Sequence, residues 1–242
     1  MKRINQNEIK IFMAIIITVD SFGFLLPTAT MTFFTMLMPC VTAWFAFNSV
    51  DSMIHTSSLK NYFARLFFLG IMLLIEGSII EKSVGSRIFI ARDNVVLTIA
   101  ISLLAIALIF FYKPKTIIGK FSRLVLIVTA LASGFLCKSG YMVLPFMFIT
   151  YIFFNEPRKR NNWYVLLSAI LLFTSIDYSQ GISDNISILA KTNGFLFILV
   201  IIFIEMYNGE RGKKSQAFKW SFYIYYLILN WALLYTINGN IM

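Results

Sequence analysis

One apolar segment near the start of the chain, Lys10–Pro27 (KIFMAIIITVDSFGFLLP), is long enough to cross a bilayer as a helix and carries a carboxylate, Asp20, near its end. An ionised acid in the hydrocarbon region costs roughly 2.5–3.5 kcal/mol even on insertion-based scales. Such a residue is retained where it faces protein, water or a partner instead of lipid. The segment therefore requires other helices around it, and we expect the chain to form a helix bundle.

The composition of the whole chain is that of a polytopic membrane protein. Of its 242 residues, 59% are hydrophobic and 13% are charged, whereas soluble domains are about half apolar and about a quarter charged. We predict an all-α transmembrane helix bundle, a single domain over residues 1–242, with about nine spans. An eight-span bundle, in which residues 188–207 do not cross, is the alternative. The expected spans are residues 9–27, 31–50, 62–80, 94–112, 121–137, 141–154, 163–176, 188–207 and 218–237.

The basic residues are distributed between alternate loops, which predicts how the bundle is oriented. With the amino terminus in the cytoplasm, all but five of the 21 lysines and arginines lie on the inner side, as the positive-inside tendency requires. We therefore expect a multi-pass protein of the cell membrane, in a bacterium the cytoplasmic membrane, with its amino terminus cytoplasmic. Because topology explains the net charge of +10, the expected partner is the lipid bilayer and not nucleic acid. The five outer basic residues are Lys82, Arg87, Arg92, Lys138 and Lys191.

Two carboxylates, Asp20 and Glu76, are expected in the outer half of the membrane. The functional interpretation is a polar chamber between the first four spans, in which one of these acids acts as a general base or positions a nucleophile. The alternative is that each is a hydrogen-bonded acid that holds helices together. Small and polar residues at helical spacing on the second and fourth spans, Asn94 and Thr98 among them, predict close helix contacts around this chamber.

His55, the only histidine, lies in an inner loop and is preceded by Asp51. It is a candidate catalyst, with an ordinary loop residue as the alternative. One histidine and two cysteines within apolar segments, Cys40 and Cys137, leave no ligand spacing for a metal, so no metal site is expected. The basic inner loops are candidates for binding the phosphates of a nucleotide-like donor, and the alternative is that they only set the topology.

Three regions of the chain together resemble the TraX family of integral-membrane proteins. The first is the start of the chain with an acid near the end of its first span, IKIFMAIIITVDSFG. The second is HTSSLKNYFARLFFLGIMLLIE from His55 to Glu76, continued by DNVVLTIAISLLAI. The third is YNGERG at residues 207–212, followed by FKWSFYIYYLILNWALL at residues 218–234. The resemblance extends over nearly the whole chain.

The resemblance implies a multi-span membrane acetyltransferase related to the transmembrane acyltransferases. The namesake of the family acetylates the amino terminus of a conjugative pilin. The resemblance therefore implies acetyl-CoA or another acyl-CoA as co-substrate, taken from the cytoplasm, and a membrane-associated, pilin-like peptide or an envelope polymer as acceptor. The candidate catalytic residues are Asp20, Glu76 and His55, and the candidates for binding the substrate or the donor are Arg65, Asn94, Thr98, Asn208 and Arg211.

Two departures from the family pattern bear on activity. The family has Asp-His in the first span, whereas here Asp20 is followed by Ser21. The family has Tyr-Pro-x-His in the last span, whereas here Tyr226 is followed by Leu-Ile-Leu. Because histidine is the usual proton carrier near neutral pH, Asp20, Glu76 or His55 must take that role in an active enzyme. The alternatives are a non-catalytic accessory, sensor or immunity protein and, less well matched because no inverted repeat is visible, a small transporter.

Overall fold

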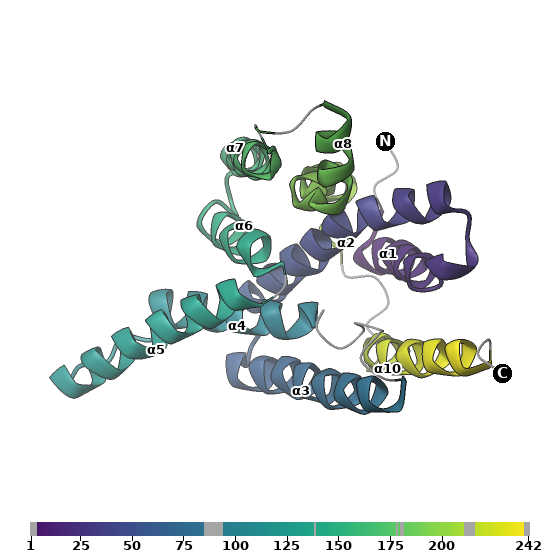
Figure 1. Ribbon diagram of the computed structural model, residues 1–242. Helices are drawn as coiled ribbons and strands as arrows, with labels where there is room; N and C mark the ends of the chain where they lie inside the picture. The colour runs from purple at the N-terminus through teal and green to yellow at the C-terminus, as the bar shows by residue number, and fades with distance from the viewer. Residues whose placement is uncertain are drawn as a thin grey trace. The chain divides into compact units, whose positions relative to one another are not determined.

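The computed structural model describes residues 4–84, 94–137, 139–177, 179, 182–210 and 216–239, and these fold into α-helices and two short 3₁₀ segments (Figure 1). This confirms the all-α prediction for the described part of the chain. The elements are α1 (Gln6–Ser21), η1 (Gly23–Leu25), α2 (Thr28–Ile54), α3 (Leu59–Val84), α4 (Val95–Phe110), α5 (Ile117–Leu136), α6 (Gly140–Ile152), α7 (Pro157–Ser175), α8 (Ile182–Lys191), η2 (Asn193–Leu199), α9 (Val200–Met206) and α10 (Gln216–Gly239).

Three of the described helices are long and apolar enough to cross a membrane, which supports membrane association. They cover Thr28–Ile54, Leu59–Ile80 and Ile117–Leu136. Shorter apolar stretches lie in α4, in α6, in η2 with α9, and in α10. Each predicted span overlaps a helix, since hydrophobic runs bounded by polar loops are a strong local signal. The count of nine spans and the cytoplasmic amino terminus stay predictions.

The predicted span at residues 188–207 is not one continuous α-helix. It consists of the end of α8, the 3₁₀ segment η2 and the short helix α9. The Ser168 hydroxyl donates a hydrogen bond of 2.8 Å to the Phe195 carbonyl, and the Asn193 amide donates one of 2.8 Å to the Thr35 carbonyl. Asn193 and Gly194 have low helix propensity, so a continuous α-helix is not favoured here. The two tertiary hydrogen bonds stabilise the non-α-helical segment instead.

Residue contacts divide the chain into two compact units, and the prediction of a single domain stays a prediction. One unit comprises Met1–Trp44 and Tyr164–Met242, and the other comprises Phe45–Trp163. The divisions fall within α2 and α7. Each unit is described by itself below.

The unit formed by Phe45–Trp163 is built around α4, which packs against α3, α5 and α6. The small polar stripe predicted on this helix is buried: Thr98 and Ser102 donate their hydroxyl hydrogens to carbonyl groups one turn earlier, at Asn94 and Thr98. Because those hydroxyl groups are satisfied within the helix, its surface presents short side chains that let neighbouring helices approach. This is the packing seam that the sequence predicted.

The link between α5 and α6 requires a glycine. Cys137 is the C-cap of α5, Ser139 adopts a left-handed conformation with φ of 61°, and α6 begins at Gly140. A Cβ atom at Gly140 would collide with the carbonyl oxygen of Gly134. The two helices can therefore turn back on each other this tightly only without a side chain at Gly140.

In the other unit, the start of the chain pairs with the link after α9. Ile4 forms an isolated parallel bridge with Tyr207, through hydrogen bonds to the Met206 carbonyl (2.9 Å) and from the Asn208 amide (3.1 Å). Asn5 and Glu8 form a capping box that starts α1. The Tyr225 hydroxyl of α10 donates to the α1 backbone at the Ala14 carbonyl, 2.8 Å away. The first and last helices of the chain therefore belong to one packed unit.

Candidate functional site

The clearest arrangement of reactive side chains is an Asp–His pair at the end of α2. His55 follows Asp51 by one helical turn, so their side chains lie on the same face. The His55 Nδ1 atom lies 3.1 Å from the Asp51 Oδ1 atom and 2.8 Å from the Asp51 carbonyl oxygen. Because both neighbours are acceptors, the hydrogen of a neutral imidazole resides on Nδ1. The Nε2 atom is then the basic nitrogen.

The two members of this pair differ in exposure in the way that a proton-transfer dyad requires. The Asp51 side chain is 9% exposed, whereas the His55 side chain is 53% exposed. A buried carboxylate orients the ring, and an exposed ring presents its second nitrogen to a ligand. The pair is therefore able to take and return a proton at the surface of this unit.

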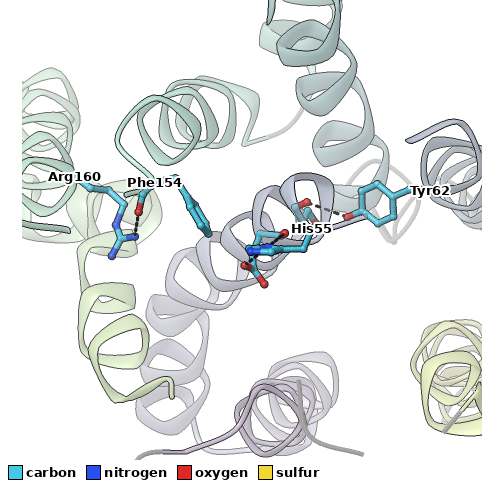
Figure 2. Close-up of polar contacts among 6 residues, drawn as sticks. His55, Tyr62, Phe154 and Arg160 are labelled. Carbon is cyan, nitrogen blue, oxygen red and sulfur yellow. Dashed lines mark hydrogen bonds and ion pairs between the residues drawn. The ribbon is translucent and has the colours of Figure 1, made fainter. Parts of the chain in front are cut away.

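Aromatic rings and a buried arginine surround the pair. The Phe154 ring lies 5.9 Å from the His55 ring and 6.4 Å from the Phe47 ring, on which it stacks. The Arg160 guanidinium carbon lies 5.3 Å from the Phe47 ring centroid, and its Nη1 atom donates to the Phe154 carbonyl at 3.5 Å. Figure 2 shows Phe154 between Arg160 and His55. Two connecting regions far apart in sequence are thereby joined.

Local sequence explains why these groups meet. α6 ends at Ile152, and α7 starts at Pro157, whose fixed φ suits a first helical position, so four residues link the two helices. This short link brings the Arg160 side chain, near the start of α7, within hydrogen-bond distance of the Phe154 carbonyl. On the α2 side, the Tyr62 hydroxyl donates to the Ser49 carbonyl at 3.1 Å, which holds the start of α3 against the end of α2 (Figure 2).

An open depression of about 520 Å³ lies next to the pair in the chain. Its lining begins at Thr56, the residue after His55, and includes the predicted donor-binding residue Arg65. Arg65 is exposed, and its Nε atom donates a hydrogen bond of 3.2 Å to the Asn61 carbonyl. This bond does not use the two Nη atoms of the guanidinium group. The depression thus combines hydroxyl groups with one cation. Its lining consists of Thr56, Ser57, Ser58, Asn61, Ala64 and Arg65.

The two predicted intramembrane acids lie in different units. Asp20, at the end of α1, is half-buried and accepts a 2.7 Å hydrogen bond from the Thr35 hydroxyl of α2. Glu76, on α3, is buried within the other unit. The Asp20–Thr35 bond supports a role in holding α1 to α2, while the shared chamber for both acids stays a prediction.

Two of the predicted binding residues, Asn94 and Thr98, have structural contacts at α4. The Asn94 Oδ1 atom accepts the Leu97 amide at 3.0 Å and so caps α4, while its Nδ2 atom donates to the Gly70 carbonyl of α3 at 2.5 Å. Thr98 is buried against its own helix, as described above. These contacts occupy both ends of the Asn94 amide. A role of Asn94 and Thr98 in ligand binding stays a prediction.

The segment that follows α9 contains the last two predicted binding residues, Asn208 and Arg211. Asn208 lies in that link, where its Oδ1 atom accepts the Glu210 amide at 2.8 Å and its Nδ2 atom donates to the Glu210 carboxylate at 3.2 Å. Asn208 therefore shapes the turn that pairs with the start of the chain. Arg211 lies outside the described residues.

Sequence reasoning did not identify two members of the site, Asp51 and Arg160. The spacing of four residues between Asp51 and His55, just after the predicted span 31–50, was the available signal for Asp51. Arg160 is the third of three consecutive basic residues, Arg158–Arg160, and it is buried whereas the other two are exposed. No local pattern distinguishes it, because its burial depends on the Phe47 ring.

Comparison of the chain with protein-family models, with curated proteins and with solved structures finds no match. The resemblance to the TraX family therefore stays a prediction.

Proposed function

We propose that the chain is an integral-membrane acyltransferase of the TraX type that moves an acyl group, acetyl in the simplest case, from acyl-CoA to a membrane-associated peptide or envelope acceptor. The single observation that carries the proposal is the Asp51–His55 pair, with its buried carboxylate and its exposed ring. It provides a histidine base in a chain that has none at the positions where the family has histidine.

In the proposed reaction, His55 Nε2 removes a proton from the acceptor amine or hydroxyl as that group attacks the thioester carbonyl. The new bond joins the acceptor nitrogen or oxygen to the acyl carbon, and the bond between the acyl carbon and the CoA sulfur breaks. His55 then returns the proton to the leaving thiolate, which departs as the free thiol. Asp51 stabilises the imidazolium that exists between these two transfers.

The donor is proposed to lie along the depression that starts at Thr56. Acyl-CoA carries several phosphate groups, and arginine binds phosphate through parallel hydrogen bonds. Arg65 is the cation in the lining, and the neighbouring hydroxyl groups and the Asn61 side chain supply further hydrogen-bonding partners. On the topology predicted from charge, this loop faces the cytoplasm, where acyl-CoA is available.

Asp20 and Glu76 are retained as the candidate acids on the acceptor side. Acidic residues are rare within membrane spans, and where they occur they commonly line the path of a polar substrate. The amino terminus of a peptide is a cation, which a carboxylate attracts. If either acid performs the proton transfer in place of His55, the variants below separate the two cases.

The proposal is tested with membranes that contain the full chain and acetyl-CoA labelled in its acetyl group. Transfer of label to the membrane fraction and release of the CoA thiol are measured together. We expect His55→Gln to lower the transfer rate by about 100-fold, the usual contribution of a positioned general base. We expect Asp51→Asn to lower it by a smaller factor, since the ring loses its orienting carboxylate but keeps its base.

Glu156→Gln is the matched control, because Glu156 is an acid in the link before α7 that is exposed and pairs with Lys159. It should transfer label at the wild-type rate. If His55→Gln transfers label as fast as the wild type, His55 is not the base. Loss of transfer in the Asp20→Ala, Glu76→Ala double variant alone would then assign the chemistry to the intramembrane acids.

A second candidate function is a non-catalytic accessory, sensor or immunity protein that keeps the family's fold. It is favoured by Ser21 and Leu229, which stand where the family has its intramembrane histidines, and by the bond from His55 to its own helix, which also caps α2. This function predicts no labelled product from the wild type. It also predicts a cellular phenotype that survives His55→Gln.

A further inference from the structure

A cluster of lysines and exposed apolar side chains lies where the chain enters α5. Lys113, Lys115 and Lys120 are exposed, and so are Ile117, Ile118 and Phe121. The three apolar side chains are 85%, 83% and 68% exposed, far more than a packed helix shows in its first turns. We call these six residues the α5 entry surface.

The length of α5 places this surface at a membrane boundary. The helix has 20 residues, and at about 1.5 Å per residue it is about 30 Å long, the thickness of the hydrocarbon core of a bilayer. Ile127, Ala130 and Leu131 pack against α4, but exposed apolar side chains continue on the rest of the helix surface from Ile117 to Leu136. A surface of this kind is suited to face lipid over the length of the helix. If Leu136 marks one boundary, then Ile117 and Ile118 mark the other, and the lysines lie at the level of the lipid headgroups.

Among the described residues, no acid neutralises the lysines of this surface. The sequence has no aspartate or glutamate between residues 94 and 155. Lys113, Lys115 and Lys120 form no ion pair with another described residue. Arg123, the fourth cation of this region, is used differently: its guanidinium donates to the Leu108 and Ile109 carbonyls at 2.8 and 2.6 Å and so joins α5 to the end of α4.

We propose that the α5 entry surface binds the headgroups of anionic phospholipids, with Ile117, Ile118 and Phe121 among the acyl chains and the three lysines on the phosphates. Lysines next to a spanning helix attract an anionic leaflet, and their apolar stems allow the ammonium groups to reach the headgroup layer. The surface draws acidic lipid to one side of the unit that also contains His55. This inference does not depend on acyl transfer.

The test uses a fluorophore attached to a cysteine at Ile118, in the full chain with Cys40→Ala and Cys137→Ala, reconstituted in phosphatidylcholine vesicles. Quenching by a minor fraction of brominated phosphatidylglycerol is compared with quenching by the same fraction of brominated phosphatidylcholine. The attraction of one lysine to an anionic surface corresponds to about a fivefold local enrichment, so at least that preference for phosphatidylglycerol is expected. High salt should reduce it.

Two matched variants and a second probe position make the result decisive. The triple variant Lys113→Gln, Lys115→Gln, Lys120→Gln should lose the preference, while the corresponding triple arginine variant should keep it. A fluorophore at Leu136, at the opposite end of the same helix and followed in sequence by one lysine instead of three, should show a smaller preference, which the triple glutamine variant leaves unchanged. Equal quenching by both lipids at Ile118 in the wild type would overturn the proposal, as would a preference that the glutamine variant retains.

Discussion

Replacement of Asn94 separates a structural role for this residue from the ligand-binding role that the sequence predicted. Asn94→Ala removes two hydrogen bonds: the cap on the Leu97 amide at 3.0 Å and the bond from Nδ2 to the Gly70 carbonyl at 2.5 Å. Loss of a helix cap costs about 1 kcal/mol. An interhelical hydrogen bond in a membrane protein contributes about 0.6 kcal/mol on average. We therefore expect the free energy of unfolding to fall by about 1.5 kcal/mol.

Thr116→Ala is the matched control for this prediction. The Thr116 hydroxyl accepts the Gly119 amide at 3.1 Å and so caps α5, as Asn94 caps α4, but it forms no described bond to another helix. Its loss should cost about 1 kcal/mol. Asn94→Asp keeps the cap and loses the bond to Gly70, so it should lie between the wild type and Asn94→Ala.

The measurement is reversible unfolding of the purified chain in mild detergent, followed by tryptophan fluorescence, together with the KM for acyl-CoA if transfer is detected. The structural role predicts reduced stability with an unchanged KM. Two results would refute the reasoning. One is an Asn94→Ala variant no less stable than Thr116→Ala, which would show that the bond between α3 and α4 contributes nothing. The other is a raised KM at wild-type stability, which would restore the ligand-binding role.

Two further predictions concern stability and topology. Arg123→Gln removes two hydrogen bonds to carbonyl groups near the end of α4. At about 1 kcal/mol for each bond, the free energy of unfolding should fall by about 2 kcal/mol in the same assay. Lys120→Gln is the control and should leave the free energy of unfolding unchanged. In a chain without its native cysteines, Ser57→Cys should react with a membrane-impermeant maleimide only in inverted vesicles, and Thr28→Cys only in intact cells; the reverse pattern would show that the amino terminus is outside.

The helical fold was predictable because each hydrophobic run is a local property of the chain. The predicted spans at 31–50 and 121–137, for example, correspond to α2 and α5 with their ends within a few residues. The interruption at Asn193 was not predictable from hydropathy, since the run continues on both sides of it. It depends on hydrogen bonds from Asn193 and to Phe195 that involve residues far away in the sequence.

The candidate site was predictable only in part. His55 was identified because it is the single histidine, and Arg65 because it follows the same loop. Asp51 faces His55 only because α2 continues to Ile54, which places the two residues one helical turn apart. The predicted span ended at residue 50, so the prediction did not include this turn. For Asn94 and Asn208 the sequence did not distinguish binding from structural roles, because an amide side chain can bond to a ligand or to the backbone of a helix or turn; their binding role stays a prediction.

By itself, the sequence determined that this chain is helical, apolar and basic at alternate loops, because those properties depend only on residue types and on the spacing of neighbours. The tertiary structure decided which side chain each polar group meets. Arg160 lies over Phe47 and Asn94 reaches Gly70 because particular helices come together. A polar group in an apolar bundle bonds to whatever acceptor or donor its neighbour presents, and that choice is made between helices and not along the chain.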